Sequence, residues 1–263
     1  VIGVMDMFAN ASRTFSYSHT PFGPILSHCV HEVPSGAHVT QMADGQIRVL
    51  APDGTLRMIP ECDTQGGAWP MRQALPPNYD GWLQYTELNA SDLGLKGGFD
   101  SFTSVMSVPD TPKQEAQILY FFPGLQNIDW IPKVDPEPTR ATPFDIIQPV
   151  LQYPAGSFER SWALKSWYVT VNAGALYSEA ISNIQPGDEI FCNMTRTGAQ
   201  SWRVSGALRS DPGKETVQQA TNPRLALQPW AYSAVAECCV ATPTRTLVTT
   251  AQHTERMPPQ PDS

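Results

Sequence analysis

The chain has 263 residues, of which 41% are hydrophobic and 16% charged, so it carries enough apolar side chains for a packed core and is not a disordered chain. Its 25 prolines are spread along the sequence, and because proline breaks helices, a mainly helical fold is excluded. The formal net charge of −8 opposes nucleic-acid binding, and no apolar run reaches the roughly 18 residues that suggest a membrane span.

The N-terminal part of the sequence contains one clear group of predicted strands. Proline and glycine interrupt any periodicity in residues 1–37, so that stretch is expected to be irregular. Two turn sequences at 43–45 and 52–54, each ending in Asp-Gly, then separate short runs that are rich in strand-forming residues. Residues 38–60 are therefore predicted to form a three-stranded β-meander.

Short strand-like runs alternate with glycine and proline turns through the rest of the chain, which is typical of a sandwich or barrel. The predicted strands lie at 82–87, 101–108, 118–122, 145–153, 162–172, 188–194, 201–208 and 230–240. From Trp162 onward, alternate side chains are predicted to share a face of the strand. Trp162 and Tyr168 should therefore lie on one face and Trp167 on the other. Pro149 lies within a run, which predicts an edge strand or a bulge there.

These elements predict an all-β fold: a two-sheet antiparallel β-sandwich with a small N-terminal β-meander. The expected divisions are residues 1–81 for the N-terminal segment and meander, 82–245 for the sandwich, and 246–263 for a mobile tail. The glycine- and proline-rich residues 63–82 are expected to link the first two parts.

The five cysteines lack the paired spacing of a zinc site, and two disulfides with one leftover thiol are expected. Cys29 and Cys62 would close the meander. Cys192 would pair with either Cys238 or Cys239, and would thereby tie two later strands together.

One short segment, His28-Cys29-Val30-His31, combines two histidines with a cysteine. A metal site needs three or four ligands in one place, and a disulfide at Cys29 would remove one of them. We therefore expect a bridged cysteine with solvated histidines, and no metal or other cofactor.

Sequons at Asn10, Asn89 and Asn193 predict N-glycosylation, with Asn10 and Asn89 favoured because they lie in polar or turn-rich surroundings. The chain starts at Val1 and shows no charged and apolar leader. The expectation is a secreted, extracellular glycoprotein from which a signal peptide has been removed.

Polar residues in two apolar strands are the candidates for chemistry. Gln148 and Gln152 are predicted to share one face of their strand with Ile146 and Val150, and a buried amide needs hydrogen-bond partners. Glu237 is the only acid in 230–240. If this carboxyl is buried, desolvation should raise its pKa, as a general acid or base requires; the alternative is an exposed strand end.

Residues 118–240 resemble the fungal glutamic peptidases (eqolisins), which are concanavalin A-like β-sandwiches of jelly-roll type. The resemblance depends on segments in the same order, rather than on close identity: Gly124-Leu125-Gln126, Ile147-Gln148-Pro149-Val150, Leu164-Lys165-Ser166-Trp167-Tyr168, Pro186-Gly187-Asp188 and the run 232–237.

The resemblance implies that Gln148 and Glu237 form a catalytic pair that hydrolyses a polypeptide substrate. The glutamate would activate a water molecule and the glutamine would stabilise the oxyanion. Gln126, Gln152, Trp167 and Tyr168 are the expected binding residues, and Trp167 or Tyr168 would wall the groove and raise the pKa of Glu237 by desolvation.

Three supporting acids of the family fall on Gln126, Ser166 and Ala234 in this sequence. A non-catalytic extracellular protein that binds carbohydrate, or that is purely structural, is therefore the alternative on the same fold. Five aromatic side chains are candidates for stacking on sugar rings, although core packing is the more ordinary role for them: Trp162, Trp167, Tyr168, Trp202 and Trp230.

Overall fold

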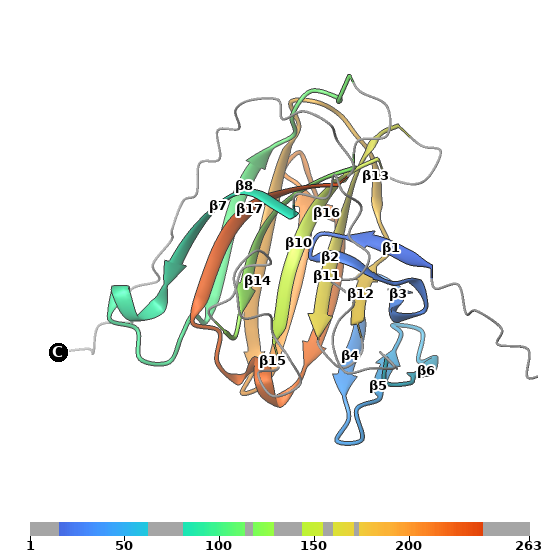
Figure 1. Ribbon diagram of the computed structural model, residues 1–263, viewed down its shortest axis with the longest axis vertical. Coiled ribbons are helices and arrows are strands. Elements are labelled where there is room, and N and C mark those ends of the chain that lie inside the picture. The colour runs from blue at the N-terminus through green and yellow to red at the C-terminus, as the bar shows by residue number, and fades with distance from the viewer. Residues whose placement is uncertain are drawn as a thin grey trace, which may run out of the picture.

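The computed structural model describes residues 16–62, 81–113, 118–128, 144–154, 160–170 and 174–238. These residues form two packed sheets, as predicted for an all-β sandwich (Figure 1). Helical structure in this part of the chain is limited to the 3₁₀ turns η1 (Ser27–Cys29), η2 (Ala90–Leu93) and η3 (Pro223–Ala226). None of these helical segments is long and apolar enough to cross a membrane.

The strands fall into two large sheets and one separate hairpin. Sheet I contains, in spatial order, β3 (Val30–Val33), β12 (Gly174–Ser178), β11 (Trp162–Thr170), β10 (Asp145–Tyr153), β9 (Ile118–Gln126), β17 (Trp230–Cys238) and β7 (Gly81–Asn89), with β13 (Ile181–Ile184) beside β11. Sheet II contains β6 (Leu56–Ile59), β5 (Ile47–Leu50), β4 (Ala37–Gln41), β16 (Asp211–Thr221), β15 (Ser201–Leu208), β14 (Glu189–Gly198) and β8 (Ser101–Ser107). The hairpin pairs β1 (Tyr17–Thr20) with β2 (Gly23–Leu26).

The main core lies between the inner faces of the two sheets. Ile147 and Tyr168 of sheet I pack in one cluster with Val39 and Trp202 of sheet II. The predicted alternation in β11 is confirmed, because Tyr168 belongs to this core whereas Trp167 packs in a second cluster on the outer face of sheet I.

The N-terminal strands belong to the sandwich rather than to a separate unit. The meander β4–β5–β6 forms as predicted, but β4 pairs with β16 and thereby extends sheet II. Strand β3 pairs with β12 at the edge of sheet I. Both junctions are parallel, so the expectation of purely antiparallel sheets is wrong there. The boundary near residue 81 stays a prediction, because residues 63–80 lie outside the described ranges.

Residues 17–33, predicted to be irregular, contain three strands. Pro21 and Gly23 do interrupt the strand, but they do so at the turn of the β1–β2 hairpin. At this turn the Thr20 hydroxyl donates a hydrogen bond to the Gly23 carbonyl at 2.5 Å. The hairpin lies across the outer face of sheet I (Figure 1), with Phe22 stacked on Phe144 at a centroid distance of 4.8 Å. The hairpin therefore covers the part of this face that includes Phe144 and Trp167.

Pro149 lies in a central strand whose pairing has no register shift on either side, so the prediction of an edge strand or a bulge is wrong. Strand β10 pairs with β11 on one side and with β9 on the other. The β9 register runs from Ile147 opposite Leu125 to Leu151 opposite Phe121, which puts Pro149 opposite Pro123. Two residues without an N–H thus face each other, and neither leaves a donor unpaired.

The predicted disulfide between Cys29 and Cys62 is present, with a Cα–Cα distance of 5.5 Å. Cys192 is a free and fully buried thiol on the inner face of sheet II. The predicted bridge from Cys192 to Cys238 or Cys239 is therefore wrong, since the Cys192 side chain is enclosed in the core. Burial raises the pKa of this thiol well above its ordinary value, which makes it unreactive.

Candidate functional site

Gln148 lies in a row of residues that crosses four strands on the outer face of sheet I. It is paired with Trp167 of β11, and the register between β10 and β9 puts Gly124 on its other side. Gly124 is in turn paired with Tyr232 of β17. Cross-strand partners in one row point to the same face, so these side chains are neighbours.

The residue that contacts Gln148 is Tyr232. Its hydroxyl donates a hydrogen bond to Gln148 Oε1 at 2.9 Å, and the two residues are only 3% and 1% exposed. A Cβ atom at Gly124 would lie 2.2 Å from the Tyr232 ring, so the absence of a side chain there lets the ring cross β9. Burial raises the pKa of Tyr232 well above its ordinary value, which keeps the phenol protonated as a donor.

Glu237 occupies a different row of sheet I. Its backbone is paired with Leu119, which is paired with Tyr153 of β10. Tyr153 follows Gln148 by five residues, and at about 3.3 Å per residue this separates the two rows by roughly 16 Å. The Glu237 side chain lies outside the described part of the structure, so its role as general base stays a prediction.

The implied binding residues are divided between the two faces of sheet I. Trp167 is paired with Gln148 and is 2% exposed, and its indole nitrogen has no hydrogen-bond partner among the described residues. Gln126 Nε2 donates to the Ile128 carbonyl at 2.8 Å, and Gln152 Nε2 donates to the Pro154 carbonyl at 3.1 Å. Tyr168 is buried on the opposite, inner face.

Stacking on sugar rings is not supported for most of the aromatic side chains suggested from the sequence. Trp162, Trp167, Tyr168 and Trp202 are each at most 2% exposed, so core packing is their role. Trp230 is partly exposed at the start of β17, where it is paired with residues of β7 and β9.

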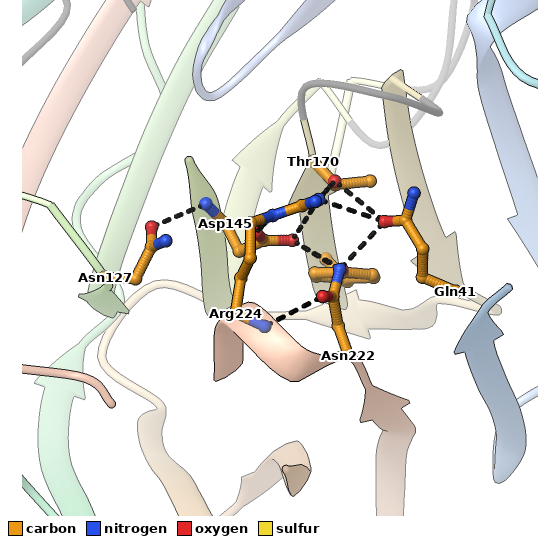
Figure 2. Close-up of polar contacts among 7 residues, drawn as sticks. Gln41, Asn127, Asp145, Thr170, Asn222 and Arg224 are labelled. Atoms are coloured by element: carbon orange, nitrogen blue, oxygen red, sulfur yellow. Dashed lines mark hydrogen bonds and ion pairs between the residues drawn. The ribbon is translucent and has the colours of Figure 1, made fainter. Parts of the chain in front are cut away.

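The sequence reasoning missed a buried polar network centred on Asp145, at the start of β10 (Figure 2). Asp145 forms an ion pair with Arg224 of η3 and accepts hydrogen bonds from the Tyr168 hydroxyl at 2.5 Å and from Asn222 Nδ2 at 3.1 Å. Asp145 is the only acid in its strand, which is the same signal that singled out Glu237.

This network joins both sheets across the end of the core. Gln41 of β4 accepts hydrogen bonds from Asn222 at 2.8 Å and from Arg224 at 3.0 Å, and Arg224 also donates to Thr170 of β11 at 2.8 Å. Burial raises the pKa of Asp145, while Arg224 and the Tyr168 hydroxyl oppose that shift. The carboxylate is fully enclosed and fully partnered, which suits an anchor between strands rather than a reacting group.

Within the described part of the chain, one group of metal-ligating side chains is brought together, with ligand atoms of His28, Cys29 and Cys62 within 4.8 Å of one another. Both cysteines are joined in the disulfide, as expected, so this group offers no thiolate.

Among the predicted glycosylation sites, Asn193 lies within β14 and Asn89 lies at the end of β7. Asn89 Oδ1 accepts a hydrogen bond from the Ser91 amide at 2.9 Å and thereby caps η2. Asn10 lies outside the described residues.

No protein-family model matches the sequence. No curated protein matches it either. Solved structures do match: scytalido-glutamic peptidase with a transition state analog inhibitor, at 14% identity and a TM-score of 0.40, and SCP-B, a member of the eqolisin family, in a complex with a tripeptide, at 14% identity and a TM-score of 0.37. Each match covers 61% of this chain; the chain spans 65% of the first structure and 64% of the second, which is less than two thirds of either. The distant resemblance to glutamic peptidases that the sequence suggested is thus found in the structure as well.

Proposed function

We propose that this chain is a secreted, non-hydrolytic protein on a glutamic-peptidase-like sandwich, and that it acts through its surface as a structural or binding component. The observation that carries the proposal is the hydrogen bond from the Tyr232 hydroxyl to Gln148 Oε1, at 2.9 Å between two buried side chains.

A glutamine that assists peptide hydrolysis needs a free amide facing the substrate and a carboxylate within reach of the same water molecule. Here the amide oxygen, the atom that could hold the attacking water molecule, is already bonded to a phenol, and the raised pKa of Tyr232 prevents that group from acting as a base near neutral pH. In the backbone register the row of Glu237 lies roughly 16 Å from the row of Gln148, and this separation supports a non-hydrolytic role.

Restricted access to Gln148 also supports a non-hydrolytic role. The hairpin residues Phe22 and Ile25 pack in one cluster with Trp167 and Val150, the neighbours of Gln148 on the outer face of sheet I. A substrate strand would have to displace this cover before it reached the amide. The disulfide between Cys29 and Cys62 supports the extracellular location, because such bridges persist in oxidising compartments.

The test is a peptidase assay with an unfolded protein substrate across acidic and neutral pH, using the wild-type chain and the variants Gln148→Ala and Glu237→Gln. All three proteins should leave the substrate intact while circular dichroism shows the sheet structure. Cleavage by the wild type that disappears in both variants would establish the hydrolase instead and overturn this proposal.

A further inference from the structure

The outer face of sheet II carries a sequon in which Asn193 and Thr195 lie in line with the preceding Phe191. Along β14, the side chains of Ile190, Cys192 and Met194 are buried in the core, and the intervening residues point outward. Phe191 is 40% exposed, and Asn193 and Thr195 are partly exposed on the same face.

The Asn193 side chain is held in a defined orientation. The Thr195 hydroxyl donates to Asn193 Oδ1 at 2.9 Å, so the amide oxygen is engaged and the amide nitrogen Nδ2 is the group left to react. The cross-strand neighbours of Asn193 are Thr103 of β8 and Ser205 of β15. Both are short side chains, but Ser205 is only 5% exposed and accepts a hydrogen bond from Arg203 Nη1 at 2.7 Å, so the more open side of Asn193 faces the partly exposed Thr103.

Phe191 provides an apolar surface beside this position. It precedes Asn193 by two residues, which on a strand puts the side chains about 6.5–7 Å apart on one face. Its cross-strand neighbours are Val105 and Ala207, so the ring lies in a small apolar patch. A pyranose ring attached to Asn193 would reach this patch and cover the exposed aromatic face.

We infer that Asn193 carries an N-linked glycan whose first N-acetylglucosamine packs on Phe191. This rests on the proposed extracellular location, and it differs from the sequence-based preference for Asn10 or Asn89. The donor is an oligosaccharide linked to a lipid diphosphate. The bond from Nδ2 to sugar C1 forms as the bond from C1 to the diphosphate breaks, the amide nitrogen loses one proton, and no oxidant takes part.

Occupancy is tested by producing the full chain behind a secretion leader in a eukaryotic host and mapping glycopeptides by mass spectrometry. The wild type and Thr195→Ser, which keeps the hydroxyl, should carry a glycan at Asn193, and Thr195→Val should not. Secreted protein that contains the Cys29–Cys62 bridge but has a bare Asn193 would overturn the inference, whatever the peptidase assay shows.

Packing on Phe191 is tested by trimming the glycan in two ways. Trimming the glycan with an enzyme that leaves the first N-acetylglucosamine on Asn193 should not change the Tm of the protein. Removing that first sugar as well should lower the Tm by about 2–4 °C. In Phe191→Ser the two treatments should give the same Tm. Equal loss of Tm on full removal in the wild type and in Phe191→Ser would refute a role for the aromatic ring.

Discussion

Gly124 makes the contact between Tyr232 and Gln148 possible, because any side chain there would occupy the space of the tyrosine ring. A methyl group at this position would lie 2.2 Å from the Tyr232 ring atoms. Gly124→Ala should therefore lower the free energy of unfolding by about 1–3 kcal/mol, the usual cost of overpacking a core. Urea denaturation of the wild type and of Gly124→Ala measures this difference in the free energy of unfolding.

Two comparisons make this test specific. At Gly213, a Cβ atom would meet nothing closer than 3.8 Å, so Gly213→Ala should leave the unfolding free energy nearly unchanged. In a Tyr232→Ala background the Gly124→Ala exchange should cost much less than in the wild type, because the clashing ring is absent. Additive effects of the two substitutions would show that Gly124 is constrained by something else.

The buried tyrosines predict a loss of stability in alkali. Burial, and secondarily the charge of Asp145, raises the pKa of Tyr168 well above its ordinary value. The unfolded chain loses the phenol proton at about pH 10, before the folded chain does, so the free energy of unfolding should fall as the pH rises past that point. Urea titrations at several alkaline pH values should show a weaker fall in Tyr168→Phe. Parallel profiles for the two proteins would contradict this.

The sequence identified Gln148 correctly as an amide on an apolar face, but it did not identify Tyr232 as its partner. A polar residue in an apolar strand is visible locally. Its partner depends on which residues of β9 and β17 share its row, and that register is set by pairing between segments far apart in the sequence.

The Asp145 network is expected to stabilise four elements at once, namely β4, β10, β11 and η3. Removing Arg224 leaves a fully buried carboxylate without its counter-charge, so Arg224→Ala should lower the unfolding free energy by about 3–5 kcal/mol. The matched control is Arg209→Ala, which breaks an ion pair with Glu189 whose side chains are 61% and 52% exposed, and should cost about 0–1 kcal/mol. Thermal or urea denaturation compares the two. Similar losses would mean that burial of Asp145 is not the deciding factor.

Some strands were predicted to the residue, β9 was predicted to end at residue 122 rather than at Gln126, and others, including the apolar β12 and the partly polar β16, were missed. The prediction at 145–153 coincides with β10, and that at 201–208 coincides with β15. Strand β16 was missed because it begins with Asp211-Pro212-Gly213 and buries Thr216 and Gln218. Its identity as a strand comes from its neighbours β4 and β15, not from its own composition.

The disulfide should contribute to the stability of the whole molecule. Cys29 and Cys62 are separated by 33 residues, and loop-closure entropy for a loop of that size gives about 3–4 kcal/mol. The double variant Cys29→Ala/Cys62→Ala should show this loss in urea denaturation, and the wild type treated with a reductant should match it. Alkylation of Cys29 in unreduced, folded protein would refute the bridge.

The parallel pairing of β3 with β12 and of β4 with β16 has a consequence for how the protein is made. A ribosome synthesises β3 and β4 early, but their partners begin only at Gly174 and Asp211. Until then the N-terminal strands have an open edge and no sheet to join, so neither sheet can be completed before these partners have been synthesised. Such long-range closure slows folding and leaves the nascent chain dependent on protection from aggregation until β16 emerges.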